Sequence, residues 1–110
     1  MPEVSFPVEV VEGVAVVTAP EEIDIANAAQ LRAALLEAAR PGPAMVVVDM
    51  SRTRFCDSAG LNALVTSDRQ ARANGGEVRL VVGAGVARVV ALTGVDRVVP
   101  VFASLEDALT

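Results

Sequence analysis

An aspartate and a serine, Asp57 and Ser58, stand side by side in the stretch RFCDSAGLNAL, and their side chains suggest chemistry. A serine hydroxyl can act as a nucleophile, accept a phosphate or cap a helix. A nucleophilic serine needs a base within hydrogen-bond reach, but the chain contains neither histidine nor lysine. Asp57 would serve as a base only by an unusual route. We therefore do not expect catalysis at Ser58.

Helix capping and phosphorylation both remain open for this pair. Asp and Ser are preferred N-cap residues, and a helical pattern begins at this point, so position alone favours capping. A cap needs only one of the two, however, and the other side chain can then project from the helix end. A hydroxyl there lies near free backbone N–H groups and the positive end of the helix dipole, which together accept a phosphate well.

Three other candidates have ordinary explanations. The Gly-Ala-Gly at 83–85 is similar to a dinucleotide-binding loop, but Arg88 replaces the third glycine and no acid ends the next strand. We expect a tight turn there. Cys56 has no basic neighbour except the arginines of the preceding loop, which predicts a small buried hydrophobe. Asp24 comes just before the first helix, where most acids are solvated or capping.

Composition narrows the function classes. The chain has 110 residues, enough for one domain (1–110), and with 53% hydrophobic but only 3% aromatic residues its core must be aliphatic. The net charge of −5 and the lack of a basic cluster argue against direct contact with nucleic acid. With no histidine and one cysteine, we expect no disulfide within the chain, no metal site and no cofactor.

The apolar segments are short. None approaches the roughly 18 residues that cross a bilayer, and the start MPEVSFPVEV lacks the pattern of a signal peptide. These features predict a cytoplasmic protein without membrane insertion.

Strand patterns dominate the first part of the chain. Val4, Phe6, Val8 and Val10 alternate with polar residues or Pro7, which predicts a strand with one buried face at a sheet edge. A Glu-Gly pair at 12–13 indicates a hairpin into the next strand. Residues 44–50 are apolar on both faces, as in a central strand covered by helices. Further strands are expected at 77–82 and 98–102.

Four helices must connect and cover these strands. Asn27, with Gln30 three residues later, predicts a capped start for the first helix, which Pro41 and Pro43 end. The second is expected at residues 58–73, the third around Val86 to Gly94, and the last is opened by Ser104. The inner faces of the first two helices are expected to carry Ala28, Leu31, Leu35 and Ala38, and Leu61, Leu64, Val65 and Ala71. The order β-β-α-β-α-β-α-β-α predicts an α/β domain with a mixed, mostly parallel sheet and an N-terminal hairpin.

The segment VVVDMSRTRFCDSAGLNAL resembles the signature of the anti-sigma factor antagonists, within the STAS domain family shared with sulphate transporters. The matching residues are Asp49, Met50, Ser51, Phe55, Asp57, Ser58, Ala59, Gly60 and Leu61. EIDIANAAQLRAAL looks like the family's first crossover, and residues 76–109 look like its second half. The resemblance therefore covers nearly the whole chain and implies a STAS-like fold.

The resemblance also implies a non-enzymatic, partner-switching regulator of transcription in a bacterium. Ser58 matches the serine phosphorylated by an anti-sigma factor that is itself an ATP-dependent kinase. The unphosphorylated protein would bind that factor and free the sigma factor, the phosphorylated form would let go, and a serine phosphatase would reset it. Asp24 matches an acid near the serine that helps shape the docking surface. The residues expected to bind the partner are Asp24, Asp57, Ser58, Ala59, Gly60 and Asn62.

Two positions depart from the family pattern. Ala59 replaces a second serine and so removes an alternative phosphate acceptor, while Asn62 stands where glycine is frequent, on the outer face of the helix start. Two other functions stay open: a STAS module of another signalling scaffold or transporter-associated complex, and a small nucleotide-binding enzyme that uses the Gly83 loop.

Overall fold

Seven strands, four α-helices and one 3₁₀ helix form the part of the chain that the computed structural model describes, residues 6–40 and 44–110. They are, in chain order, β1 Val8–Val11, β2 Val14–Thr18, β3 Glu22–Ile23, α1 Ala28–Ala38, β4 Met45–Met50, β5 Phe55–Cys56, α2 Ser58–Ala73, β6 Glu77–Val82, α3 Ala84–Thr93, η1 Val95–Arg97, β7 Val101–Phe102 and α4 Leu105–Ala108. Val4, Pro41 and Pro43, which the sequence placed in a first strand and at a helix end, lie outside the described residues.

Five strands form the main sheet in the order β1-β2-β4-β6-β7. The hairpin strands β1 and β2 are antiparallel, and all the other neighbours are parallel. At the hairpin, Glu12 and Gly13 have positive φ angles of 52° and 80°, as in a two-residue turn whose twist matches the strands. The mixed, mostly parallel sheet with an N-terminal hairpin is confirmed.

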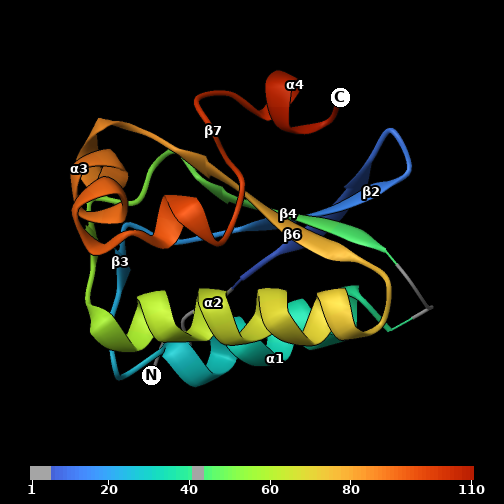
Figure 1. Ribbon diagram of the computed structural model, residues 1–110, viewed down its shortest axis with the longest axis horizontal. Coiled ribbons are helices and arrows are strands. Elements are labelled where there is room, and N and C mark those ends of the chain that lie inside the picture. The colour runs from blue at the N-terminus through green and yellow to red at the C-terminus, as the bar shows by residue number, and fades with distance from the viewer. Residues whose placement is uncertain (1–5, 41–43) are drawn as a thin grey trace.

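The sheet has two differently covered faces. Alternate residues of β4 point to opposite sides. Val46, Val48 and Met50 join the large core cluster under α1, α2 and α3, whereas Val47 packs in a small cluster with Ala108 of α4. Figure 1 shows α1 and α2 side by side along one face and α4 on the other. The prediction of a central strand covered by helices is confirmed, and helices lie on both sides of it.

Two strand predictions were wrong in detail. The first strand does not bury one face, since Val8 is 47% and Val10 73% exposed. The edge position expected from Pro7 is confirmed, since β1 is the first strand of the sheet. The last strand is also shorter than predicted, because η1 and the turn after it take up the segment that contains Val98.

A second, two-stranded sheet was missed. The strands β3 and β5 pair in parallel, with Ile23 opposite Cys56 and Glu22 opposite Phe55. Ile23 and Cys56 are buried in the main core, whereas Glu22 and Phe55 are exposed. Two residues per strand are too few to give a periodic signal in the sequence. We call this pair the β3–β5 ribbon.

Candidate functional site

The start of α2 separates the two roles that the sequence left open. Asp57 is the N-cap residue, and its Oδ1 accepts hydrogen bonds from the backbone N–H groups of Ala59 at 2.9 Å and Gly60 at 3.1 Å. Ser58, the first residue of the helix, is exposed. The aspartate therefore caps the helix and the serine hydroxyl remains at its tip, as one of the two sequence interpretations requires.

The Asp57 cap changes the electrostatic surroundings of a phosphate on Ser58. The sequence suggested that free N–H groups at the helix start would receive it, but two of them already donate to Asp57. A phosphate would thus face the Asp57 carboxylate as well as the positive end of the helix dipole. The local field is less favourable to the modification than a vacant helix start would be.

The β3–β5 ribbon brings a second acid to the same place. The backbone N–H of Asp57 donates to the carbonyl of Ile23 at 3.1 Å, and Asp24 follows Ile23 just as Asp57 follows its partner Cys56. Because parallel strands end at the same edge, the two aspartates leave the ribbon side by side. Asp24 is half-buried, and its Oδ1 accepts from the N–H of Ala26 at 2.9 Å. We call Asp24, Asp57 and Ser58 the Ser58 site.

Asn27 holds the turn that contains Asp24. The sequence predicted a capping side chain, but Asn27 makes no side-chain cap bond to α1. Its Oδ1 instead accepts from the N–H of Asp24, and its Nδ2 donates to the carbonyl of Glu22, both at 2.9 Å. The expected helix start is confirmed, since Asn27 is the N-cap residue, but its side chain, 5% exposed, closes the preceding turn instead of capping α1. This positioning residue could have been suspected from the Asp-x-x-Asn spacing.

Gly60 lets α2 sit directly on the ribbon. A Cβ at this position would lie 2.7 Å from both Cys56 Sγ and Ile23 Cγ2. Gly60 is buried, and the role that the structure shows for it is this close contact. Ala59 is half-buried and Asn62 is exposed on the same helical turn. Contact of these three residues with a partner stays a prediction.

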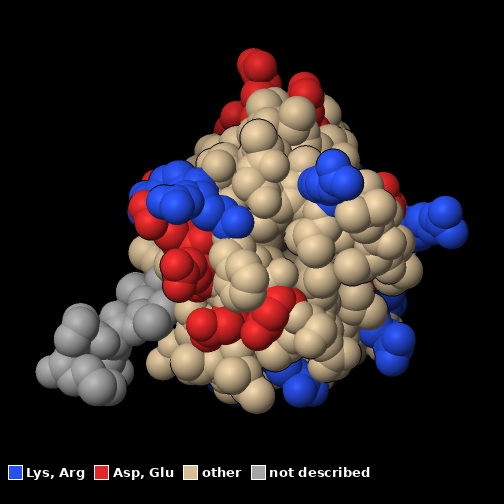
Figure 2. Space-filling view, turned by 90° about the vertical axis from the view of Figure 1, so that its left-hand side faces the viewer, with Lys and Arg blue, Asp and Glu red and all other residues tan. Residues whose placement is uncertain are grey.

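Two large apolar side chains beside the Ser58 site are exposed, and sequence reasoning did not single them out as a surface. Ile25, next to Asp24, is 83% exposed, and Phe55, at the start of β5, is 51% exposed. Figure 2 views this side of the molecule, where acidic side chains lie at the left and in the lower middle, with arginines beside them at the upper left and uncharged surface between these groups. The face therefore offers both carboxylates and apolar contact area.

Cys56 takes no part in this surface. It is a free cysteine, 5% exposed, and burial together with the neighbouring Asp57 carboxylate raises the pKa of its thiol to about 12. The thiol stays protonated near neutral pH and is a poor nucleophile. The prediction of a small buried hydrophobe is confirmed.

The glycines at 83 and 85 allow close packing. A Cβ on Gly83 would lie 2.6 Å from the carbonyl oxygen of Ser51, and one on Gly85 would lie 2.7 Å from that of Thr53. The start of α3 is thereby pressed onto the loop that leads into β5. This contact explains both glycines without a nucleotide.

The described residues meet neither the requirements of a metal site nor those of a membrane-spanning helix. Within residues 6–40 and 44–110, no three His, Cys, Asp or Glu side chains lie close enough together to hold a metal ion. None of the helices in the same described ranges has the length and apolar character needed to cross a membrane.

Comparisons with known proteins agree with this geometry. Residues 5–108 match the family model of the STAS domain. Over 101 residues the chain is 35% identical to the anti-sigma-F factor antagonist RsfB of Mycobacterium tuberculosis. The aligned residues cover 89% of this chain and 80% of RsfB. A crystal structure of an anti-sigma factor antagonist from Mycobacterium paratuberculosis has a TM-score of 0.83 at 33% identity, covering 94% of this chain and 88% of that one. SpoIIAA of Bacillus in its unphosphorylated form shares the fold, with a TM-score of 0.76 at 24% identity over 96% of this chain and 93% of SpoIIAA.

Proposed function

The chain belongs to the STAS domain family, and we propose that it acts there as an anti-sigma factor antagonist. In this role it binds an anti-sigma factor through the Ser58 site and frees the sigma factor for transcription. The partner is itself a serine kinase, phosphorylation of Ser58 ends the complex, and a serine phosphatase restores the binding form. The names of RsfB and of the mycobacterial crystal structure support the general role.

The exposed hydroxyl of Ser58 is the observation that carries the proposal. Asp57 already caps α2, so the serine is not needed to hold the helix start. A kinase reaches an exposed hydroxyl at a helix tip without opening the fold. The helix dipole offsets part of the added charge, so the phosphorylated protein should remain folded.

The charge of the Ser58 site explains how one phosphate can end binding. The group adds about −1.5 to −2 charges at neutral pH, next to Asp57 and on the same ribbon end as Asp24. A partner packed over Ser58 must then accommodate the bulk, desolvate the phosphate and tolerate three negative groups. A loss of about 3 kcal/mol of binding free energy weakens association about a hundredfold.

Ile25 and Phe55 give the proposed docking surface its apolar part. Interface centres are enriched in aromatic and apolar side chains that become buried on binding. Both residues flank the two aspartates and are exposed in the isolated protein. An anti-sigma factor would cover them together with Ser58, which places the modified residue beside apolar contact area.

Phosphorylation by the cognate anti-sigma kinase tests the proposal. Incubation with the kinase and ATP should add one phosphate, located by mass spectrometry on Ser58, and Ser58→Ala should abolish it. In calorimetry, Ser58→Ala should still bind the anti-sigma factor, whereas Ser58→Asp should bind it more weakly. The single charge of aspartate should give only part of the effect of a phosphate.

Ser67 provides the matched control on the same helix. It is 5% exposed, so Ser67→Ala should leave phosphate incorporation unchanged. Phosphate found on Thr66 or Ser67 would disprove the assignment to Ser58. Equal affinities of Ser58→Ala and Ser58→Asp would disprove release by charge, and co-purification with a permease instead of a sigma regulator would favour the transporter-associated alternative.

A further inference from the structure

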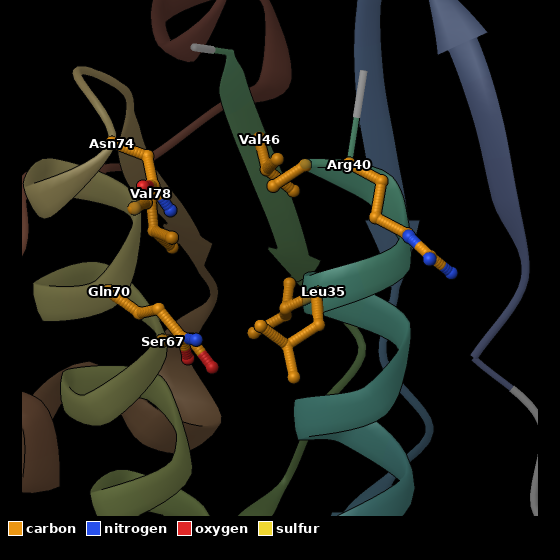
Figure 3. Close-up of a pocket in the computed structure, with 10 residues that line it drawn as sticks. Leu35, Arg40, Val46, Ser67, Gln70, Asn74 and Val78 are labelled. Carbon is orange, nitrogen blue, oxygen red and sulfur yellow. The ribbon is translucent and has the colours of Figure 1, made fainter. Parts of the chain in front are cut away.

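A cavity of about 430 Å³ lies between α1 and α2 towards the ends of both helices, away from Ser58. Its volume falls in the range of roughly 300–1,000 Å³ that is typical of small-molecule sites. Its walls come from α1, α2, β4 and β6 (Figure 3). The lining residues are Leu35, Leu36, Ala39, Arg40, Val46, Ser67, Gln70, Ala71, Asn74 and Val78.

The cavity has an apolar floor and a more polar lip. Leu35, Val46 and Val78 are at most 2% exposed and form the floor, with Ala71 beside them at 7%. Gln70, like Asn74 and Arg40, is exposed and lines the cavity at its mouth. Such a gradient suits a molecule with an apolar body and one polar end.

Ser67 supplies an unused hydrogen-bonding group inside the cavity. The residue is 5% exposed, and its hydroxyl has no hydrogen-bond partner among the described residues. Leaving a buried polar group unpaired costs about 1–3 kcal/mol, so an unpaired group of this kind calls for an explanation. In Figure 3 the Ser67 side chain points into the space between the two helices, towards Leu35.

A second polar side chain of α2, that of Gln70, points the same way. Positions 67, 70, 71 and 74 have the three- and four-residue spacing that places side chains on one helix face. Gln70 extends into the cavity beside Ser67, whereas the Arg40 guanidinium points away from it (Figure 3) and lies 3.3 Å from Glu37. The groups that converge are thus a neutral hydroxyl and a neutral amide, in a protein of net charge −5.

We propose that this cavity binds a small neutral amphiphile. The apolar chain of the ligand lies against Leu35, Val46 and Val78, and its hydroxyl or amide head pairs with the Ser67 hydroxyl and the Gln70 amide. The site is separate from the Ser58 site, and the proposal holds whether or not Ser58 is phosphorylated.

A titration with 1-octanol, followed by ¹⁵N–¹H correlation spectra of the full chain, tests the proposal. Saturable shifts are expected in the amide signals of Leu35, Ser67, Ala71 and Val78, with smaller changes at Ser58. The absence of saturable shifts up to the solubility limit of the probe, as for a cavity that holds only water, overturns the proposal. Shifts confined to other parts of the molecule overturn it as well.

Two serine variants on the same helix make a matched pair. Ser67→Ala removes the hydroxyl that pairs with the head group, and the loss of one hydrogen bond should weaken octanol binding about fivefold. Ser58→Ala makes the same chemical change outside the cavity and should leave the affinity unchanged. Equal weakening by both variants, or by neither, contradicts the role of Ser67.

Two further measurements address the ligand class and the location. Octanoate has the same chain length with an anionic head and should bind more weakly than octanol at pH 7.5; tighter binding would overturn the neutral-head assignment. Ala71→Leu fills part of the cavity and should abolish octanol binding while the spectrum keeps its dispersion. Unchanged octanol binding by that variant overturns the proposed location of the site. If Ala71→Leu does not fold, the comparison of Ser67→Ala with Ser58→Ala tests the location instead.

Discussion

The start of α2 and its second half carry the same pair of residue types in opposite environments. At the start, Asp57 bonds to N–H groups of its own first turn, and Ser58 is exposed. Further along, Asp68 is 1% exposed and accepts from the N–H of Val78 at 3.2 Å and from Arg72 Nε at 2.9 Å, beside the buried Ser67. One aspartate closes a local turn, whereas the other ties the helix to β6.

This difference shows how position decides the role of a serine. Where a neighbouring aspartate satisfies the backbone and the helix ends in solvent, the hydroxyl is accessible to an enzyme. Where the aspartate is used for a tertiary contact and the helix is covered, the hydroxyl faces a cavity. The comparison predicts that substitution of Asp68 causes a large loss of stability and that substitution of Ser58 causes a small one.

Asp68→Ala should have the largest effect, a loss of about 3 kcal/mol in the free energy of unfolding. The change leaves the buried N–H of Val78 without an acceptor and removes the link between α2 and β6. Urea denaturation measures the loss. Asp68→Asn keeps an acceptor oxygen and should lose clearly less, and equal losses for the two variants would show that the hydrogen bond to Val78 is not what matters.

Gly60→Ala should come next, with a loss of about 2 kcal/mol. The added methyl would collide with Cys56 and Ile23, and overpacking of a tight contact typically costs about 1–3 kcal/mol. Asn62→Ala, on the exposed side of the same helical turn, should stay within about 0.5 kcal/mol of the native protein. Thermal unfolding of both variants checks the pair, and an undisturbed Gly60→Ala protein would argue against close seating of α2 on the ribbon.

Asp57→Ala and Ser58→Ala should show the smallest effects and separate the two neighbours. Loss of an N-cap side chain costs about 1 kcal/mol, whereas an exposed serine next to an intact cap should cost at most about 0.5 kcal/mol. Chemical denaturation of both variants under one condition gives the difference. A larger loss for Ser58→Ala would mean that the serine, and not the aspartate, secures the helix start.

The sequence predicted the Ser58 end well because its signals are local. An Asp-Ser pair before an apolar helical pattern predicts a cap, and α2 begins and ends at the expected residues, Ser58–Ala73. The assignment of capping to Asp57 needed the structure, since either side chain satisfies the same preference. The role of the Asn27 side chain also needed the structure, because its amide forms hydrogen bonds within the turn before α1 and none to the helix itself.

Features that depend on how elements meet were not predictable. The buried Asp68 pairs with a residue from another element, and the cavity at Ser67 exists only because α1 and α2 leave space between them over β4 and β6. The exposed β1 valines mislead an alternation argument, which assumes that a helix covers the strand. The sequence contains the residues for each of these features, but their environment arises from packing over long distances along the chain.

The β3–β5 ribbon has a consequence for how proteins of the STAS domain family diversify. Its inward residues, Ile23 and Cys56, belong to the core, whereas Phe55 and the adjacent Ile25 contribute little to it. After gene duplication, outward positions can drift while the scaffold stays intact. Sister proteins built on the same ribbon can thus come to present different contact surfaces while their cores stay alike.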